Sequence, residues 1–166
     1  MKWVWMIGGG LVMVVALVAA IGTMLPQSHH ASRSARFRQR PETIYAVVAG
    51  PPDWRSGVKS FGSLPGGKSW EEDGHKQKIT YELVDDRPPT RRVVRIADRS
   101  LPFGGTWTIE IAPECGGSAV RVSEDGEIYN VIFRFIARFF MGYTSTIDGY
   151  LNDLGRKIGE PVRIEA

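Results

Sequence analysis

The chain has 166 residues, of which 43% are hydrophobic and 23% are charged. This balance is typical of a globular protein and excludes a disordered one. The net charge of +3 is small, and no arginine cluster is interleaved with aromatic residues on a strand, so nucleic acid is not an expected partner. The single cysteine, Cys115, excludes a disulfide framework and a cysteine-based metal site.

The N-terminal segment is continuously apolar. Residues 3–25 contain only apolar residues, glycines and one threonine, and Pro26 follows them. This length suffices for a helix that spans a membrane, whereas the apolar core of a signal peptide is usually shorter. A cleavable signal is the alternative, because Ala20-Ile21-Gly22 resembles a cleavage site. We predict a transmembrane anchor over residues 1–25 and a polar tether over residues 26–31.

Basic residues predict how the anchor is oriented. Four arginines occur within residues 33–40, whereas only Lys2 and the amino terminus precede the apolar segment. Positive charge is retained on the cytoplasmic side of a membrane, so a single-pass protein with a cytoplasmic body is expected. This count loses weight if the arginines belong to a folded strand.

The remaining chain is expected to form one domain over residues 32–160, followed by a tail over residues 161–166. Alternating polarity predicts a first strand over residues 32–37, and Pro41 opens a short helix that ends at Gly50-Pro51-Pro52. Turn signals separate six further predicted strands, over residues 58–64, 68–72, 76–84, 90–97, 106–111 and 118–124. Because the connections are short, neighbouring strands should pair as an antiparallel meander.

The C-terminal third predicts one long amphipathic helix over residues 130–158. Asn130 is a suitable N-cap, and Gly159-Glu160-Pro161 is a stop signal. Apolar residues at steps of three or four form one stripe: Ile132, Ile136, Phe139, Tyr143, Ile147, Tyr150, Leu154 and Ile158. The predicted fold class is α+β, with a curved seven-stranded antiparallel sheet wrapped round this helix and a cavity between them.

Several segments also resemble known proteins: Pro41-Glu42-Thr43-Ile44-Tyr45, Trp54-Arg55, Arg95-Ile96-Ala97-Asp98, residues 101–107, residues 124–130 and Phe133-Arg134-Phe135. With the order of elements, they resemble the SRPBCC superfamily, which includes START domains and the polyketide cyclase/dehydrase and lipid transport group. The nearest similarity is to membrane-anchored bacterial members. The resemblance covers residues 32–159 and implies the helix-grip fold. Val131 stands where a proline often follows the asparagine in this group, which implies a softer helix start.

Side chains on the inner faces of sheet and helix predict the wall of the cavity. The apolar candidates are Trp70, Tyr81, Trp107, Ile109, Val122, Phe139, Tyr143 and Ile147. The alternative is that these residues simply fill the core. The polar candidates are Arg95 and Glu124, which we expect to pair because a charge buried alone is prohibitive. The pair is either a structural salt bridge or a device that orients a ligand.

No catalytic or metal site is predicted. His29 and His30 fall in the tether and His75 in a hairpin, so none of them is placed as a base in the cavity. The sequence has no Ser-His-Asp order, no metal-ligand spacing and no phosphate-binding loop. No cofactor is therefore expected.

The start of the long helix carries more apolar residues than one stripe can bury. Two arginines lie among these residues, which are Phe133, Phe135, Phe140 and Met141. The pattern indicates either a segment that rests on the bilayer beside the anchor or aromatic residues at the edge of the cavity.

Together these features favour a monomeric, membrane-anchored domain that binds a hydrophobic small molecule, lipid or isoprenoid-like, without catalysis. An apolar ligand partitions into the bilayer to which the domain is tethered. A cyclase or aromatase-type enzyme is the first alternative, and it needs a titratable group such as Glu124, Glu72 or Tyr81 in the cavity. A scaffold or interaction domain with a filled core is the second alternative, and cavity volume distinguishes it from the other two.

Overall fold

The computed structural model describes residues 2–74 and 77–166, so the predicted hairpin histidine, His75, lies outside the described residues. In chain order the elements are α1 (Lys2–Met24), β1 (Ser28–Phe37), α2 (Pro41–Ala49), the 3₁₀ turn η1 (Pro52–Trp54), β2 (Val58–Ser63), β3 (Ser69–Gly74), β4 (Lys78–Arg87), β5 (Arg91–Ile96), β6 (Phe103–Glu114), β7 (Gly117–Ile128), α3 (Val131–Ile136), the π-helical turn η2 (Ala137–Met141), α4 (Ser145–Ile158) and β8 (Ile164–Glu165). The predicted α+β class is therefore confirmed.

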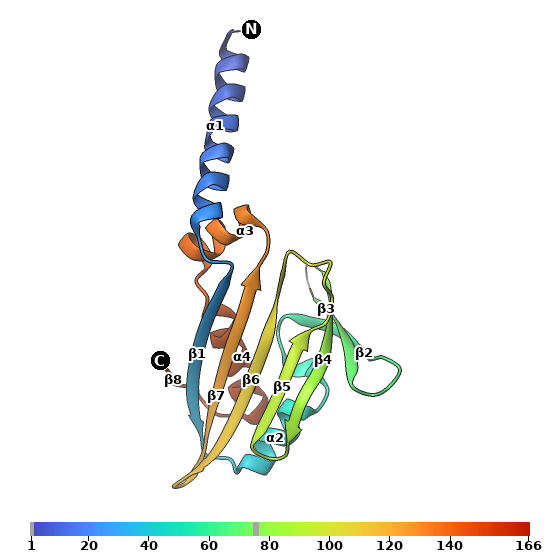
Figure 1. Ribbon diagram of the computed structural model, residues 1–166. Helices are drawn as coiled ribbons and strands as arrows, with labels where there is room; N and C mark the ends of the chain where they lie inside the picture. The colour runs from blue at the N-terminus through green and yellow to red at the C-terminus, as the bar shows by residue number, and fades with distance from the viewer. Residues whose placement is uncertain (1, 75–76) are drawn as a thin grey trace.

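One antiparallel sheet forms the body, in the order β2-β3-β4-β5-β6-β7-β1-β8 (Figure 1). Strands β2 to β7 form the predicted meander. The sheet has eight strands rather than the predicted seven, because the tail folds back and Glu165 pairs with Ser34 of β1. Strand β1 begins at Ser28, where it pairs with Glu127 of β7, so most of the predicted tether is strand.

The β6–β7 hairpin is longer than its two predicted strands because Pro113 does not end β6. Pro113 pairs with Ser118 of β7, whereas β5 pairs with β6 only as far as Glu110. Beyond Glu110, β6 has a free edge, where a missing backbone N–H costs nothing. The hairpin turns at Cys115 and Gly116, at the end of the sheet opposite α1 (Figure 1).

The predicted single C-terminal helix is wrong, because the chain is interrupted between α3 and α4. The N-cap is confirmed, since the Asn130 side chain accepts a hydrogen bond from the Phe133 N–H at 3.0 Å. After η2, Gly142 has φ +72° and ψ 159°, a conformation that is essentially limited to glycine. Helix α4 then ends at Gly159, whose φ is +75°.

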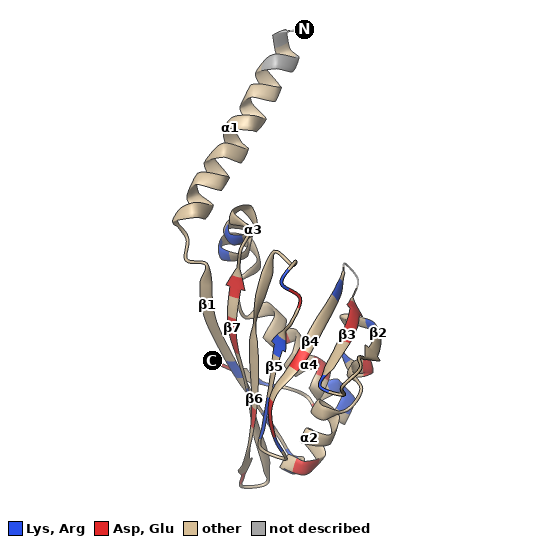
Figure 2. Ribbon diagram, turned by 45° about the vertical axis from the view of Figure 1, so that its right-hand side comes forward, with Lys and Arg blue, Asp and Glu red and all other residues tan. Residues whose placement is uncertain are grey.

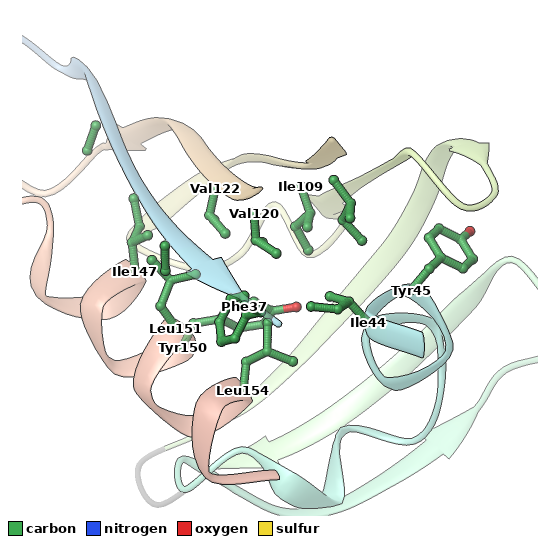
Figure 3. Packing of buried hydrophobic residues seen from close by; sticks show 13 residues of the cluster. Phe37, Ile44, Tyr45, Ile109, Val120, Val122, Ile147, Tyr150, Leu151 and Leu154 are labelled. Atoms are coloured by element: carbon green, nitrogen blue, oxygen red, sulfur yellow. The ribbon is translucent and has the colours of Figure 1, made fainter. Parts of the chain in front are cut away.

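The hydrophobic core lies between α4 and the middle of the sheet (Figure 3). Ile147, Leu151 and Leu154 are fully buried on α4 and meet Val120 and Val122 of β7. The loop after η1 is fixed to the same helix, because Asp153 accepts hydrogen bonds from the Ser56 N–H at 2.6 Å and from its hydroxyl at 2.8 Å. The predicted packing of a helix against the sheet is therefore confirmed for α4 alone.

Helix α1 projects from one end of the body (Figure 1) and carries no charged residue between Trp3 and Met24 (Figure 2). Its residues Met6–Met24 have a mean hydropathy of 2.2, and the helix is long and apolar enough to cross a membrane. A signal sequence has the same composition. The end of α1 packs on α3, where a Cβ added to Gly22 would meet the carbonyl oxygen of Val131.

Candidate ligand-binding cavity

A cavity of about 610 Å³ lies between the concave face of the sheet, the chain around η1 and residues 133–150. Its volume is in the range of small-molecule sites. Six of the predicted wall residues line it: Trp70, Tyr81, Trp107, Ile109, Glu124 and Tyr143. The cavity therefore lies where the alternation of the strands predicted it.

Four predicted site residues do not line the cavity. Val122 and Ile147 are fully buried in the core below it. Phe139 is 57% exposed, because the π-helical turn carries it outward. Arg95 lies on the outer face of the sheet, where its guanidinium pairs with the Glu82 carboxylate at 2.7 Å. The predicted Arg95–Glu124 pair is therefore wrong.

Aromatic side chains form much of the wall. Trp70 and Tyr81 are direct partners in the β3–β4 register, and their rings stack with centroids 5.8 Å apart. Tyr150 of α4 meets the ring of Trp107 edge-on at 5.6 Å and that of Trp54 at 5.1 Å. Such edge-to-face pairs add about 1 kcal/mol each to the burial of the rings, so they stabilise this part of the wall.

The first polar group in the wall is an ion pair. The Arg55 guanidinium donates to both carboxylate oxygens of Glu72, at 2.9 and 2.8 Å. The Trp70 indole donates to the same carboxylate at 3.0 Å, and the Glu72 side chain is only 6% exposed. Burial raises the pKa of Tyr81, and the adjacent Glu72 raises it further, so the phenol stays protonated and can donate a hydrogen bond.

Arg92 is a cavity residue that the sequence did not single out. It lies over the Trp70 ring at 5.9 Å and pairs with Asp86 at 3.1 Å. Val94 and Ile96 line the cavity on the same face of β5. Both alternating sets of β5 residues contain an arginine beside apolar residues, so the pattern could not tell Arg92 from Arg95.

The second polar group joins β1, β7 and the start of α4. The His29 Nε2 lies 3.9 Å from a carboxylate oxygen of Glu124, and its ring stacks on Tyr143 with centroids 4.2 Å apart. The ring passes so close to Gly126 that a Cβ there would lie 2.3 Å from it. Glycine at position 126 is therefore required for the imidazole to reach the cavity.

Burial shifts the pKa values of both members of this group in the direction that favours their uncharged forms. Burial lowers the pKa of His29, and His30 lowers it further, while burial raises the pKa of Glu124 against the opposing effect of Trp107. The His29 Nδ1 is buried and has no hydrogen-bond partner among the described residues. An imidazole and a carboxyl whose pKa values are shifted toward each other in this way can bind a polar group or transfer a proton.

The sequence prediction excluded His29 from the cavity, and this was wrong. The exclusion followed from placing residues 26–31 in a tether, whereas these residues mostly belong to β1. Ala31, Ala35 and Phe37 are buried on one face of β1. Extending that alternation by two residues would have placed His29 on the same inner face. Among the described residues, no cluster of three His, Cys, Asp or Glu side chains is arranged to hold a metal ion.

The chain is similar in structure to several solved proteins. A conserved protein from Geobacillus kaustophilus has a TM-score of 0.67 at 13% identity, covering 83% of this chain and 100% of its own. An uncharacterised protein from Bacillus thuringiensis has a TM-score of 0.64 at 18% identity, covering 80% and 100%. Norcoclaurine synthase from Thalictrum flavum has a TM-score of 0.62 at 10% identity, covering 85% and 92%.

Norcoclaurine synthase has also been solved with dopamine and hydroxybenzaldehyde bound, and that structure matches with a TM-score of 0.61 at 11% identity. No family model matches the sequence, and no curated protein matches it. At identities of 10–18% these likenesses show the fold alone. They support a helix-grip fold, in which a curved sheet and a C-terminal helix enclose a ligand cavity.

Proposed function

We propose that this chain is a membrane-anchored protein that binds a hydrophobic small molecule, lipid or isoprenoid-like, in the cavity between the sheet and α4. The observation that carries the proposal is the cavity of about 610 Å³ with aromatic and aliphatic walls. Apolar walls with a few convergent polar groups are the usual form of a small-molecule site. The volume also argues against a scaffold with a filled core.

The apolar helix α1 supports the choice of ligand class. A ligand with this much apolar surface concentrates in the bilayer, because each CH₂ removed from water contributes about 0.8 kcal/mol. A domain anchored by residues 2–24 would meet its ligand at high local concentration. The proposal also keeps the body in the cytoplasm and monomeric. Arg33 and Arg36 belong to β1, so the charge bias behind this orientation rests on Arg38 and Arg40, against Lys2 before the helix.

The test is to purify the full-length chain from its host in nanodiscs and to identify retained small molecules by extraction and mass spectrometry. The variant Val94→Trp fills the cavity, whereas Val84→Trp adds the same ring to an exposed position of β4. We expect one hydrophobic species to co-purify with the wild type and with Val84→Trp, and to be lost from Val94→Trp. A folded wild type without any such species, or one that Val94→Trp retains equally, would contradict the proposal.

A second candidate function is favoured by one observation. His29 and Glu124 lie together in the wall with an unpartnered Nδ1 and opposite shifts of pKa, an arrangement suited to general acid–base catalysis. This is the cyclase or aromatase-type alternative, with His29 added to the carboxyl group. It predicts that the extract of His29→Gln contains a substrate that the wild type converts, whereas the binding function predicts the same molecule in both extracts.

A further inference from the structure

The segment from α3 to η2 lies beside the end of α1 (Figure 1). Several of its apolar side chains are exposed. Phe140 is 78% exposed and Phe139 is 57% exposed. The exposed apolar surface continues along the same segment through Ile132, Ile136 and Met141. Adjacent bulky apolar residues at this exposure mark a surface that contacts an apolar partner.

The local backbone produces this exposure. In η2 the Gly142 N–H donates to the Ala137 carbonyl at 3.0 Å, which closes a turn of five residues rather than four. The wider turn carries Phe139 and Phe140 away from the body. Gly142, with its positive φ, then redirects the chain into α4.

A tight joint fixes this segment to the end of α1. The Arg134 guanidinium is 9% exposed and donates to the carbonyls of Leu25 at 3.1 Å and Gly22 at 3.5 Å. It also donates to the carbonyls of Ile128 at 2.9 Å and Tyr129 at 3.2 Å. One side chain therefore holds the last turn of α1, the end of β7 and α3 together. The exposed apolar segment is therefore held close to the C-terminal end of α1.

The same segment forms one wall of the cavity. Phe133, Ala137 and Gly142 line it, and Met141, which is half exposed, borders both the cavity and the outer apolar surface. A ligand that crossed this wall would pass directly between the outer apolar surface and the cavity.

We propose that residues 131–142 lie in the headgroup region of the bilayer that α1 spans and form the passage by which the ligand moves between bilayer and cavity. The proposal rests on the proposed function for the identity of the passenger. The occupant of the outer face is the lipid surface, because that face is continuous with the end of an apolar helix long enough to span the membrane. Arg138, exposed on the same turn, reaches the lipid phosphates as interfacial arginines do.

The first test measures contact with lipid and needs no ligand. In the full-length chain with Cys115→Ser, a single cysteine is introduced by Phe140→Cys or by Val84→Cys and labelled with an environment-sensitive fluorophore. Val84 is 52% exposed on β4 and serves as the matched control. In vesicles that contain lipids brominated near the headgroup, we expect strong quenching at position 140 and none at position 84.

Equal quenching at the two positions, or none at position 140, would overturn the proposal. A disulfide between two copies of Phe140→Cys without quenching by lipid would assign the face to a second copy and would also overturn it.

The second test measures passage. A dansyl-labelled fatty acid is the probe, and its transfer from vesicles to the cavity is followed by fluorescence from the cavity tryptophans. We expect Phe140→Asp to slow the transfer at least several-fold without changing the amount bound at equilibrium, and Val84→Asp to leave the rate unchanged. An unchanged rate in Phe140→Asp would overturn the passage. Quenching at position 140 with no probe bound by any variant would refute the proposed function and the passage, and leave the bilayer contact standing.

Discussion

At the scale of single residues, the polar groups in the cavity avoid the cost of burial in two ways. Arg55 and Glu72 stay charged and neutralise each other through two hydrogen bonds. For His29 and Glu124, burial instead lowers the pKa of the imidazole and raises the pKa of the carboxyl, which favours the uncharged form of each. An isolated buried charge would cost far more than either arrangement. The two groups should therefore respond differently to mutation and to pH.

Removing one member of the ion pair tests the first group. We expect Glu72→Gln to lower the free energy of unfolding by about 3 kcal/mol, because it leaves the Arg55 guanidinium with no countercharge in a largely buried site. The matched control is Glu82→Gln, which breaks the exposed Glu82–Arg95 pair and should cost at most about 1 kcal/mol. Chemical denaturation of the full chain in detergent measures both. Equal losses in the two variants would show that the Arg55–Glu72 pair is no more important than a surface pair.

The pH dependence of stability tests His29. Its pKa is lowered from 6.5 by burial, so below pH 6.5 the unfolded chain binds a proton that the folded chain does not. Stability should therefore fall as the pH drops below 6.5, and this loss should be smaller in His29→Gln. Thermal unfolding at a series of pH values measures it, with the variant compared with the wild type at each pH.

Glu124→Gln supplies a control of opposite sign. The raised pKa of Glu124 means that the folded chain binds the extra proton, so its contribution to stability is present below pH 4.5 and is lost as the pH rises above that value. In Glu124→Gln this loss should disappear. If both variants changed the curve in the same direction, the opposite effects of burial on the pKa values of His29 and Glu124 would be refuted.

The sequence could predict the aromatic wall but not its polar residues, and the reason is physical. Trp70, Tyr81 and Trp107 lie on strands with clear alternation, and size and polarity together determine which face is inward. On β5 both alternating sets contain arginine, so Arg92 and Arg95 are equivalent until pairing places one of them opposite Asp86. Which carboxylate a buried arginine meets depends on the register between distant strands, and no local pattern contains that information.

At the scale of elements, the interrupted C-terminal helix is the main difference from the sequence prediction. The apolar stripe continues in step from Ile132 to Ile158, and nothing in its period marks the break. Helix prediction from the sequence relies on periodicity over a long window, whereas the break depends on the backbone conformation of one residue, Gly142. The glycine was visible in the sequence, but an isolated glycine within a helical pattern is usually tolerated.

Two glycines of the C-terminal region test this interpretation. Gly142 has φ +72°, so we expect Gly142→Ala to lower the free energy of unfolding by about 1–3 kcal/mol through backbone strain. Gly149 lies within α4 with open space around its Cβ position, so Gly149→Ala should raise stability by up to about 1 kcal/mol. Denaturant unfolding of both variants measures the difference. If the two alanines had the same effect, α3 and α4 could form one continuous helix.

At the scale of the whole molecule, the functional parts follow one another in space along the long axis of the protein. Figure 1 shows α1 at one end, α3 beside its base and the β6–β7 hairpin at the far end. The Arg134 joint lies where α1 meets α3, and the cavity lies between the sheet and residues 133–150. Under the proposed anchoring, the joint would therefore do more than tether the body, because it would fix the orientation of the cavity relative to the bilayer. The sequence analysis predicted a polar tether over residues 26–31, where the structure has the start of β1, and it did not predict the Arg134 joint to Gly22 and Leu25.

This orientation can be measured from the single native cysteine. Cys115 is exposed at the tip of the β6–β7 hairpin, and strands of 12 residues at about 3.3 Å per residue separate it from the joint by roughly 40 Å. Energy transfer from a donor on Cys115 to acceptor lipids should therefore be weak in the full-length wild type. In Arg134→Ala the carbonyls of Gly22 and Leu25 lose their shared donor, the body tilts toward the bilayer, and transfer should increase.

Two further variants separate hydrogen bonding from charge. Arg134→Lys keeps the positive charge but not the planar fork that reaches several carbonyls at once, so its transfer should lie between those of the wild type and Arg134→Ala. Arg121→Ala removes the same charge from an exposed site on β7 and should leave transfer unchanged. If energy transfer in Arg134→Ala matched that in the wild type, the contacts of Arg134 with α1 would not determine the orientation of the body. They would then also not explain how the apolar segment is placed at the membrane.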